Sequence, residues 1–159
     1  MADLRVGTAV DAHRLVAGRR LVLGGVEIAH PLGLEGHSDA DVVCHVLTDA
    51  LLGATGLGDI GRMFPGTDEW KDVASLDLLR LARERAGEAG WSLVNADCMV
   101  VCMEPRLAPH VDAMRAACAD ALASTPDRVS IRGTGTDGLG FTGRGEGIAA
   151  QAVVLVERG

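Results

Sequence analysis

The feature that most constrains this chain is a glycine-rich segment near its C-terminus, residues 133–147. Seven of the 21 glycines in the 159-residue chain lie in these fifteen residues. Glycine without a structural use costs conformational entropy, so this density predicts a loop whose backbone amides face a ligand. The segment matches G-x-G-x-x-G twice, but a dinucleotide-binding fold needs a helix and a further strand after that motif. Only residues 148–159 follow and they form an apolar strand pattern, which excludes that fold.

The polar side chains of this segment indicate what the loop binds. Arg144 stands where a P-loop has its lysine, so the Walker A motif is excluded as well. Backbone amides and hydroxyls suit phosphate oxygens, and a carboxylate among them suits a divalent cation such as Mg²⁺. The alternative is an ordinary turn between two strands that carries these polar side chains without binding a ligand. The side chains concerned are Thr134, Thr136, Asp137, Thr142 and Arg144.

Charge and cysteine content narrow the classes of protein further. The 22 acidic and 15 basic side chains give a net charge of −7, which argues against a nucleic-acid-binding protein. Every apolar run is shorter than the roughly 20 residues of a membrane span, and the first residues show no secretory signal. The four cysteines form no Cys-x-x-Cys pair and lie among apolar residues. We therefore expect buried free thiols in a reducing cytoplasm.

Hydrophobic periodicity and turn residues predict a single α+β domain over residues 1–159. Helices are expected from a cap at Ser38 or Asp39 to about residue 54, from a cap at Ser75 to residue 90, and over 108–123. Residues 59–72 read as a long loop. We expect a mixed β-sheet with helices packed on one face, and another subunit covering the other face. The expected strands are residues 4–12, 20–23, 26–29, 91–103, 129–132 and 148–156, the second and third joined through Gly24-Gly25.

A metal site is suggested by Asp11 and His13, which are two apart at a strand end and so share one face. His45 on the following helix supplies a third ligand, and two histidines with one carboxylate leave an open position, as in catalytic zinc sites. Asp41 and Asp49 flank His45 at i−4 and i+4, where either could orient its imidazole. An ordinary strand end and a hydrogen-bonded helix histidine explain the same residues, and spacing alone favours that interpretation.

His37 and Ser38 lie where a helix N-terminus would present free amides. A cation beside a helix N-terminus suits a phosphate, and an ordinary capping loop is an equally good explanation on these residues alone.

Five blocks of sequence, taken together, resemble the 2-C-methyl-D-erythritol 2,4-cyclodiphosphate synthase family of the non-mevalonate isoprenoid pathway, and they span nearly the whole chain. The blocks are Asp11-Ala12-His13, Gly36-His37-Ser38-Asp39-Ala40-Asp41 with His45, Gly58-Asp59-Ile60-Gly61 with Phe64-Pro65, Pro105-Arg106-Leu107-Ala108-Pro109, and residues 138–147.

The resemblance implies a ferredoxin-like arrangement and a homotrimer with active sites between subunits. It implies that the substrate is 4-diphosphocytidyl-2-C-methyl-D-erythritol 2-phosphate, whose 2-phosphate attacks the β-phosphorus, expelling CMP and closing a cyclic diphosphate. Asp11, His13 and His45 would bind zinc, and Asp137 would hold a second cation, Mg²⁺ or Mn²⁺. The reaction is intramolecular, so positioning and charge neutralisation suffice without a protein nucleophile.

The resemblance also implies roles for further residues. His37 would stabilise the transition state, and Gly135 occupies the catalytic position at which the family usually has threonine. The implied substrate-binding residues are Asp11, His13, His37, Ser38, Asp59, Ile60, Gly61, Phe64, Pro65, Gly66, Thr67, Asp68, Cys102, Met103, Glu104, Pro105, Arg106, Leu107, Ala108, Thr134, Gly135, Thr136, Asp137, Phe141 and Arg144.

Three departures from the family pattern leave other functions open. Gly135 lacks a hydroxyl, Asp137 replaces a common glutamate, and Gly66 replaces a common aspartate. One alternative is a related metal-dependent phosphohydrolase. Another is a catalytically weak protein that binds a nucleotide or an isoprenoid diphosphate.

Overall fold

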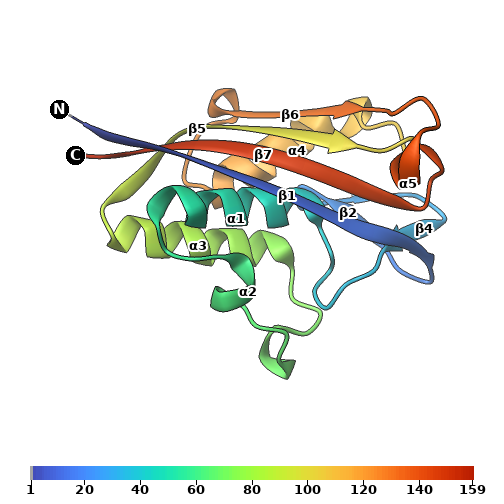
Figure 1. Ribbon diagram of the computed structural model, residues 1–159, viewed down its shortest axis with the longest axis horizontal. Helices are drawn as coiled ribbons and strands as arrows, with labels where there is room; N and C mark the ends of the chain where they lie inside the picture. The colour runs from blue at the N-terminus through green and yellow to red at the C-terminus, as the bar shows by residue number, and fades with distance from the viewer. Residues whose placement is uncertain (1) are drawn as a thin grey trace.

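The first and last strands pair along nearly their whole length and form the centre of the fold (Figure 1). The computed structural model describes residues 2–159. Strand β1 (Asp3–Ala17) runs antiparallel to β7 (Gly147–Arg158) from Asp3 opposite Arg158 to Arg14 opposite Gly147. Strand β5 (Trp91–Val101) continues the sheet antiparallel to β7, and β6 (Val129–Thr134) lies parallel to β5. With β4 (Leu32–Leu34) beside β1, the order β4-β1-β7-β5-β6 confirms a mixed sheet.

Three helices cover one face of this sheet, as predicted (Figure 1). Helix α1 (Val42–Thr55) packs on β1 and β7, and α4 (Val111–Ala121) packs on β6. Helix α3 (Ser75–Glu88) lies against both of these helices. The approach of α1 to β1 is so close that a Cβ on Gly7 would overlap the carbonyl oxygen of Ala50.

The alternation of side chains along the strands separates a buried from an open face. On β7 the even-numbered residues, such as Ala152 and Val154, are buried beneath the helices. On β1 the opposite face carries Val6 and Val10, which are 67% and 73% exposed. An apolar sheet face is therefore left uncovered in the single chain.

The start of α1 differs from the sequence prediction. Its N-cap is Asp41, not Ser38 or Asp39, and the Asp41 carboxylate accepts hydrogen bonds from the amides of Val43 and Cys44. The same buried carboxylate accepts from the amides of Gly24 and Gly25. These two glycines, both at positive φ, form the predicted turn between β2 (Leu21–Leu23) and β3 (Val26–Ile28). Asp41 thus joins the hairpin to the helix.

Other boundaries also depart from the predictions. Strand β1 extends five residues beyond Ala12, because residues 13–14 still pair with β7 and residues 15–17 pair with β4, which the sequence did not predict. Ser75 is the first residue of α3 and not its cap. The helix expected over 108–123 is a 3₁₀ turn, η2 (Ala108–His110), followed by α4. Short helices occupy the expected loops: α2 (Ile60–Met63), η1 (Asp68–Trp70), η3 (Pro126–Arg128) and α5 (Gly140–Gly143).

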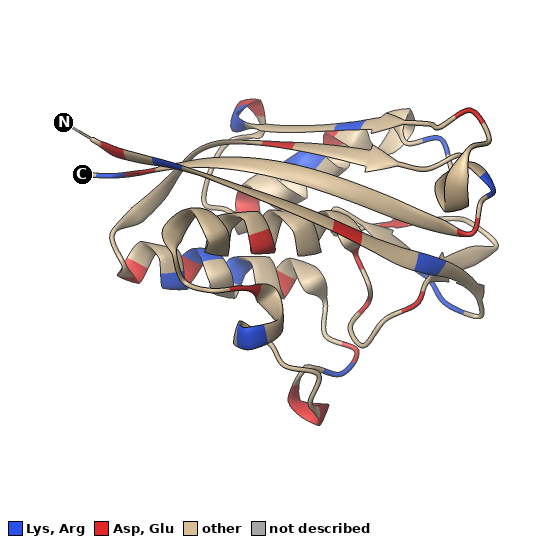
Figure 2. Cartoon of the chain, viewed as in Figure 1, with Lys and Arg blue, Asp and Glu red and all other residues tan. Residues whose placement is uncertain are grey.

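The cysteines, the surface charge and the length of the helices bear on the classes of protein that composition excluded. All four cysteines are buried free thiols, as predicted, and burial raises the pKa of Cys44 and Cys98. Helix α3 carries both acidic and basic residues, and Figure 2 shows both signs of charge spread over the elements. Within residues 2–159 we find no helix with the length and apolar character needed to span a membrane.

Candidate metal centre and nucleotide pocket

Three predicted ligands converge where β1 passes over α1. Asp11 and His13 project from the helix-facing side of β1 and meet His45 in the first turns of α1. The His13 Nε2 atom lies 2.9 Å from Asp11 Oδ2 and 3.1 Å from His45 Nδ1. The Asp11 Oδ2 atom lies 3.2 Å from the same His45 nitrogen. One ligand atom from each residue thus falls within 4.8 Å of the others, and no other such group of acidic, histidine or cysteine residues occurs in residues 2–159.

The hydrogen bonds of His13 leave the correct nitrogen free for a metal. Its Nδ1 lies 2.8 Å from the backbone carbonyl of Glu35, which can only accept, so Nδ1 carries the hydrogen. The Nε2 of the neutral ring then keeps its lone pair toward Asp11 and His45. This is the arrangement by which a carbonyl fixes the tautomer of a metal-binding histidine. The donor set fits zinc or a similar divalent ion.

In the absence of a metal, electrostatics at this centre favour the ionised form of Asp11 and the protonated form of His13. Burial by itself raises the pKa of Asp11, but hydrogen bonds and charge from His13 and His45 outweigh it and lower that pKa below its usual range. Burial lowers the pKa of His13, and the hydrogen bond and charge of Asp11 more than reverse this, so the net pKa is raised. A metal cation would replace the proton that the three side chains share.

The residues predicted to orient His45 have other roles. Asp41 caps α1, and the Oδ1 atom of Asp49 accepts a hydrogen bond from the Ile60 amide at the start of α2. The outer nitrogen of His45, Nε2, lies 3.0 Å from Ser38 Oγ and 2.9 Å from Ser75 Oγ. The prediction that Asp41 or Asp49 orients His45 is therefore wrong, because hydroxyls from outside the helix contact the imidazole ring.

A cavity of about 250 Å³ opens beside the metal centre. Loop 59–73 forms one wall, and the catalytic candidate His37 lies on the other. The His37 Nε2 lies 2.7 Å from the Thr67 carbonyl, so Nε2 donates and the ring is tied to that loop. Eight lining residues were predicted: His13, His37, Ser38, His45, Ile60, Gly61, Phe64 and Gly66. Three were missed, Trp70, Val73 and Leu78, whose apolar character in the sequence indicated only packing.

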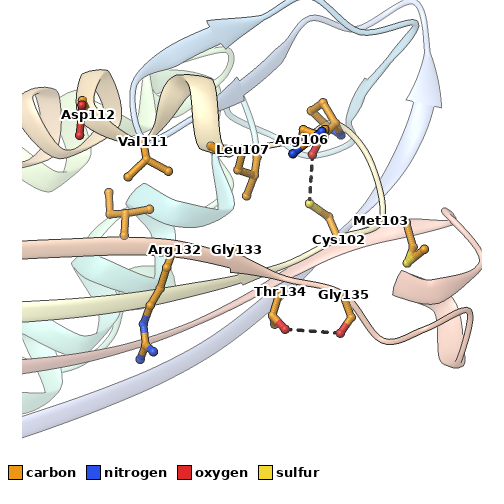
Figure 3. A pocket seen from close by; sticks show the side chains of 13 residues that line it. Cys102, Met103, Arg106, Leu107, Val111, Asp112, Arg132, Gly133, Thr134 and Gly135 are labelled. Carbon is orange, nitrogen blue, oxygen red and sulfur yellow. Dashed lines mark hydrogen bonds between the residues drawn. The ribbon is translucent and has the colours of Figure 1, made fainter.

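A second cavity, of about 560 Å³, lies at the ends of β5 and β6 (Figure 3). The segment after β5 forms one wall and Gly133–Gly135 form the other. Within this cavity the Cys102 thiol donates to the Pro105 carbonyl over 3.7 Å. The predicted lining residues are Cys102, Met103, Pro105, Arg106, Leu107, Ala108, Thr134 and Gly135. The missed ones are Val111, Asp112, Ile131, Arg132 and Gly133, which belong to regular elements whose ends reach the cavity.

The glycine-rich segment connects β6 to β7 and remains largely exposed. Asp137 adopts positive φ, and within residues 2–159 it belongs to no group of three or more potential metal ligands. Arg144 pairs with Glu146 at 2.7 Å. Thr136 donates to the carbonyl of Leu139. Residues 133–135 of the segment line the second cavity, whereas residues 136–147 line neither of the two cavities.

The two cavities have no lining residue in common. Within one chain, the metal-binding residues and the pocket after β5 are thus separate. Most of the predicted site residues line one cavity or the other. The predicted residues that line neither are Asp11, Asp59, Pro65, Thr67, Asp68, Glu104, Thr136, Asp137, Phe141 and Arg144.

Comparison with known proteins identifies the family of the chain. The sequence model of the YgbB family matches residues 4–157. The chain belongs to the YgbB family. Within it, a 2-C-methyl-D-erythritol 2,4-cyclodiphosphate synthase of Moorella thermoacetica is 56% identical over 154 residues, 96% of this chain and 94% of the relative.

Solved structures share the YgbB fold found here. A 2C-methyl-D-erythritol-2,4-cyclodiphosphate synthase with bound CDP matches with a TM-score of 0.87 at 37% identity, over 96% of this chain and 99% of the other. The bifunctional IspDF of Campylobacter jejuni matches with a TM-score of 0.95 at 39% identity, over all of this chain and 43% of the other. The chain thus spans less than half of that bifunctional protein.

Proposed function

We propose that the protein is a 2-C-methyl-D-erythritol 2,4-cyclodiphosphate synthase acting in isoprenoid precursor biosynthesis. It converts 4-diphosphocytidyl-2-C-methyl-D-erythritol 2-phosphate to the 2,4-cyclodiphosphate and CMP. The observation that carries this proposal is the convergence of Asp11, His13 and His45 within 4.8 Å in a YgbB-family chain. Relatives over 50% identical along nearly the whole chain bear the name of this synthase.

The chemistry needs binding and charge neutralisation more than a protein nucleophile, because the attacking phosphate belongs to the substrate. A zinc ion held by Asp11, His13 and His45 would act as a Lewis acid on a phosphate oxygen. Ser38 and His37 line the same cavity, where the Ser38 hydroxyl would donate to the phosphates and His37 would contact them. His37 already donates through Nε2 to Thr67, which fixes its ring where the cavity opens. Loop 59–68 would enclose the methylerythritol and ribose groups.

The larger cavity is the proposed cytosine site. Its walls offer backbone groups of residues 102–108 together with the apolar side chain of Leu107, a combination suited to a flat polar base. Solved relatives contain bound CDP, which supports a cytidine nucleotide as the ligand. Thr134, Thr136, Phe141 and Arg144 would then contact the phosphates from the glycine-rich segment. Asp137 would hold Mg²⁺ or Mn²⁺ there, with phosphate oxygens completing its ligands.

We further propose that the active protein is a homotrimer. The uncovered sheet face with Val6 and Val10 needs a partner surface, and the two half-sites within one chain share no residue. A cyclic assembly would bring the metal centre of one subunit to the cytosine cavity of its neighbour. In this proposal residues 1–159 form one ferredoxin-like domain, and the four free thiols suit a cytoplasmic location.

Phosphorus NMR of the purified protein with substrate, Zn²⁺ and Mg²⁺ tests the proposal. We expect the cyclic diphosphate and CMP to appear together. Release of inorganic phosphate without the cyclic product would instead identify a phosphohydrolase. Binding of CMP without turnover would identify a weakly catalytic binding protein. The hydroxyl missing at Gly135 would be the physical reason for its weak catalysis.

A further inference from the structure

Two residues behind the metal centre form a hydrogen-bonded chain that leads away from His45. The His45 Nε2 atom lies 2.9 Å from Ser75 Oγ, and that hydroxyl is hydrogen-bonded to Asp39 Oδ1. Ser75 comes from the first turn of α3, and Asp39 from the loop before α1. From the sequence, both residues were expected only to cap helices.

The chemistry of the partners fixes the direction of these hydrogen bonds. A carboxylate accepts, so the Ser75 hydroxyl donates to Asp39. The Ser75 oxygen is then left to accept from His45, which requires a hydrogen on Nε2. In the neutral ring this leaves the lone pair on Nδ1, the atom 3.2 Å from Asp11 and 3.1 Å from His13. The hydrogen bonds from Asp39 through Ser75 therefore select the tautomer of His45 that can bind a metal.

We propose that Ser75 and Asp39 are positioning residues that hold His45 in its metal-binding tautomer and orientation. This inference rests on the metal centre of the proposed function. Ser75 is 0% exposed, so its hydroxyl is out of reach of a substrate and acts only through His45. The arrangement parallels that of His13, whose outer nitrogen donates to the Glu35 carbonyl.

Ser38 cannot fully replace Ser75 and Asp39 in holding His45. Its hydroxyl also lies 3.0 Å from His45 Nε2, but it accepts from the Ala40 amide and lines the cavity beside the metal centre. If the Ser38 hydroxyl turns toward a bound phosphate, its contact with His45 is lost. Ser75, anchored by Asp39, keeps the ring fixed when Ser38 does so.

A purely structural explanation makes a different prediction. The Asp39 Oδ2 atom accepts from the Ser75 amide over 3.2 Å, so the pair also satisfies the first turn of α3. If capping were the only role, substitution would lower the free energy of unfolding and leave metal affinity unchanged. Metal affinity therefore separates the two explanations.

The experiment is chelator competition for Zn²⁺ on the full-length protein, with urea unfolding of each variant in parallel. We expect Ser75→Ala to weaken zinc binding about ten-fold, the lower end for loss of such a partner because Ser38 remains. Ser75→Thr, which keeps the hydroxyl, should restore most of the affinity, and Asp39→Asn should weaken it. Thr48→Val is the matched control, because it removes a buried hydroxyl that donates only to the Cys44 carbonyl, one turn from His45.

Zinc affinity of Ser75→Ala and Asp39→Asn equal to that of the wild type would overturn the assignment and leave capping as their role. If Ser75→Ala does not fold, Asp39→Asn and the ¹⁵N shifts of His45 in the zinc-loaded wild type decide, since hydrogen on Nδ1 would contradict the proposal. Wild-type protein that binds no zinc, or His45→Ala protein that binds it as tightly as the wild type, would overturn the metal centre itself.

Discussion

At the scale of single residues, the protons of the metal centre govern its response to pH. In the metal-free protein, the lowered pKa of Asp11 makes its contribution to stability complete above its ordinary value of 3.8 and lost as pH falls through the lowered pKa. The raised pKa of His13 makes its contribution complete below its ordinary value of 6.5 and lost as pH rises through the raised pKa. The pair thus stabilises the metal-free fold most between these two values.

We expect this window to disappear when the pair is removed. The difference in free energy of unfolding between metal-free wild type and Asp11→Asn, measured in urea from pH 3 to pH 8, should be largest at about pH 4 to 6.5. A difference that is constant with pH would contradict the assigned pKa shifts.

Gly135 offers a second prediction at this scale. A Cβ built there would lie 3.5 Å from Met103 Sδ and 3.9 Å from the Cys102 carbonyl, both ordinary contacts, so a side chain fits. A single hydroxyl on developing phosphate charge contributes roughly 10²-fold or more, and the neighbouring Thr134 can replace part of it. We expect Gly135→Thr to raise kcat about ten-fold, as measured by CMP release. Gly135→Ala fills the same space without the hydroxyl and should leave kcat unchanged, so equal gains in both variants would refute the explanation.

The three candidate metal ligands could be named from the sequence, because strand spacing places Asp11 and His13 on one face. The family resemblance, and not the spacing, favoured a metal site over an ordinary strand end. It could not identify the partners of His45. Ser75 is 30 residues away, and it reaches the ring only because α3 packs against α1. Asp41 was misassigned because α1 begins at Val42, which makes it a cap instead of a neighbour on the helix surface.

At the scale of elements, Asp41 is the junction on which α1 and the β2–β3 hairpin depend. Its side chain is fully buried and accepts from four backbone amides, two in each element. Burial raises the pKa of Asp41, and the amides of Gly25 and Cys44 oppose that rise.

We expect Asp41→Ala to lower the free energy of unfolding by about 3 kcal/mol, because it leaves several buried amides without acceptors. Urea unfolding measures the loss. Asp112→Ala is the control, since Asp112 is a fully exposed aspartate in the first turn of α4. A loss below about 1 kcal/mol for Asp41→Ala would show that water or neighbouring groups replace the carboxylate.

The main helices and strands could be predicted because their apolar periodicity is long and their turns carry glycine. Gly24 and Gly25 adopt the positive φ that their pairing in sequence suggested. Strand β4 was missed because three residues after Pro31 carry no periodicity, and it exists only by pairing with the end of β1. On α3, Leu78 is buried, whereas Leu81 is 37% exposed.

At the scale of the whole molecule, the sheet has one covered and one open face. The sequence predicted that a second subunit would cover the open face, since its helices suffice for one side only. That the two cavities combine across subunits is implied by the family resemblance and remains a proposal, because periodicity and spacing in one sequence carry no information on contacts between chains.

We expect Val10→Asp, which puts a charge on the open face, to convert the proposed trimer to a folded monomer without activity. Sedimentation measures the assembly, and circular dichroism the fold. Leu81→Glu adds a charge on the helical side and should leave the trimer intact. A Val10→Asp protein that sediments with the wild type would place the interface elsewhere.

Complementation between two inactive variants tests the central claim most directly. His45→Ala removes a metal ligand, and Ala108→Trp fills the proposed cytosine cavity, which Ala108 lines from its exposed position. If each site combines the metal centre of one subunit with the cavity of its neighbour, an equal mixture assembled together should form the cyclic diphosphate at about a quarter of the wild-type rate, because that share of interfaces is intact. No activity in the mixture, with both variants trimeric and inactive alone, would contradict a site shared between subunits.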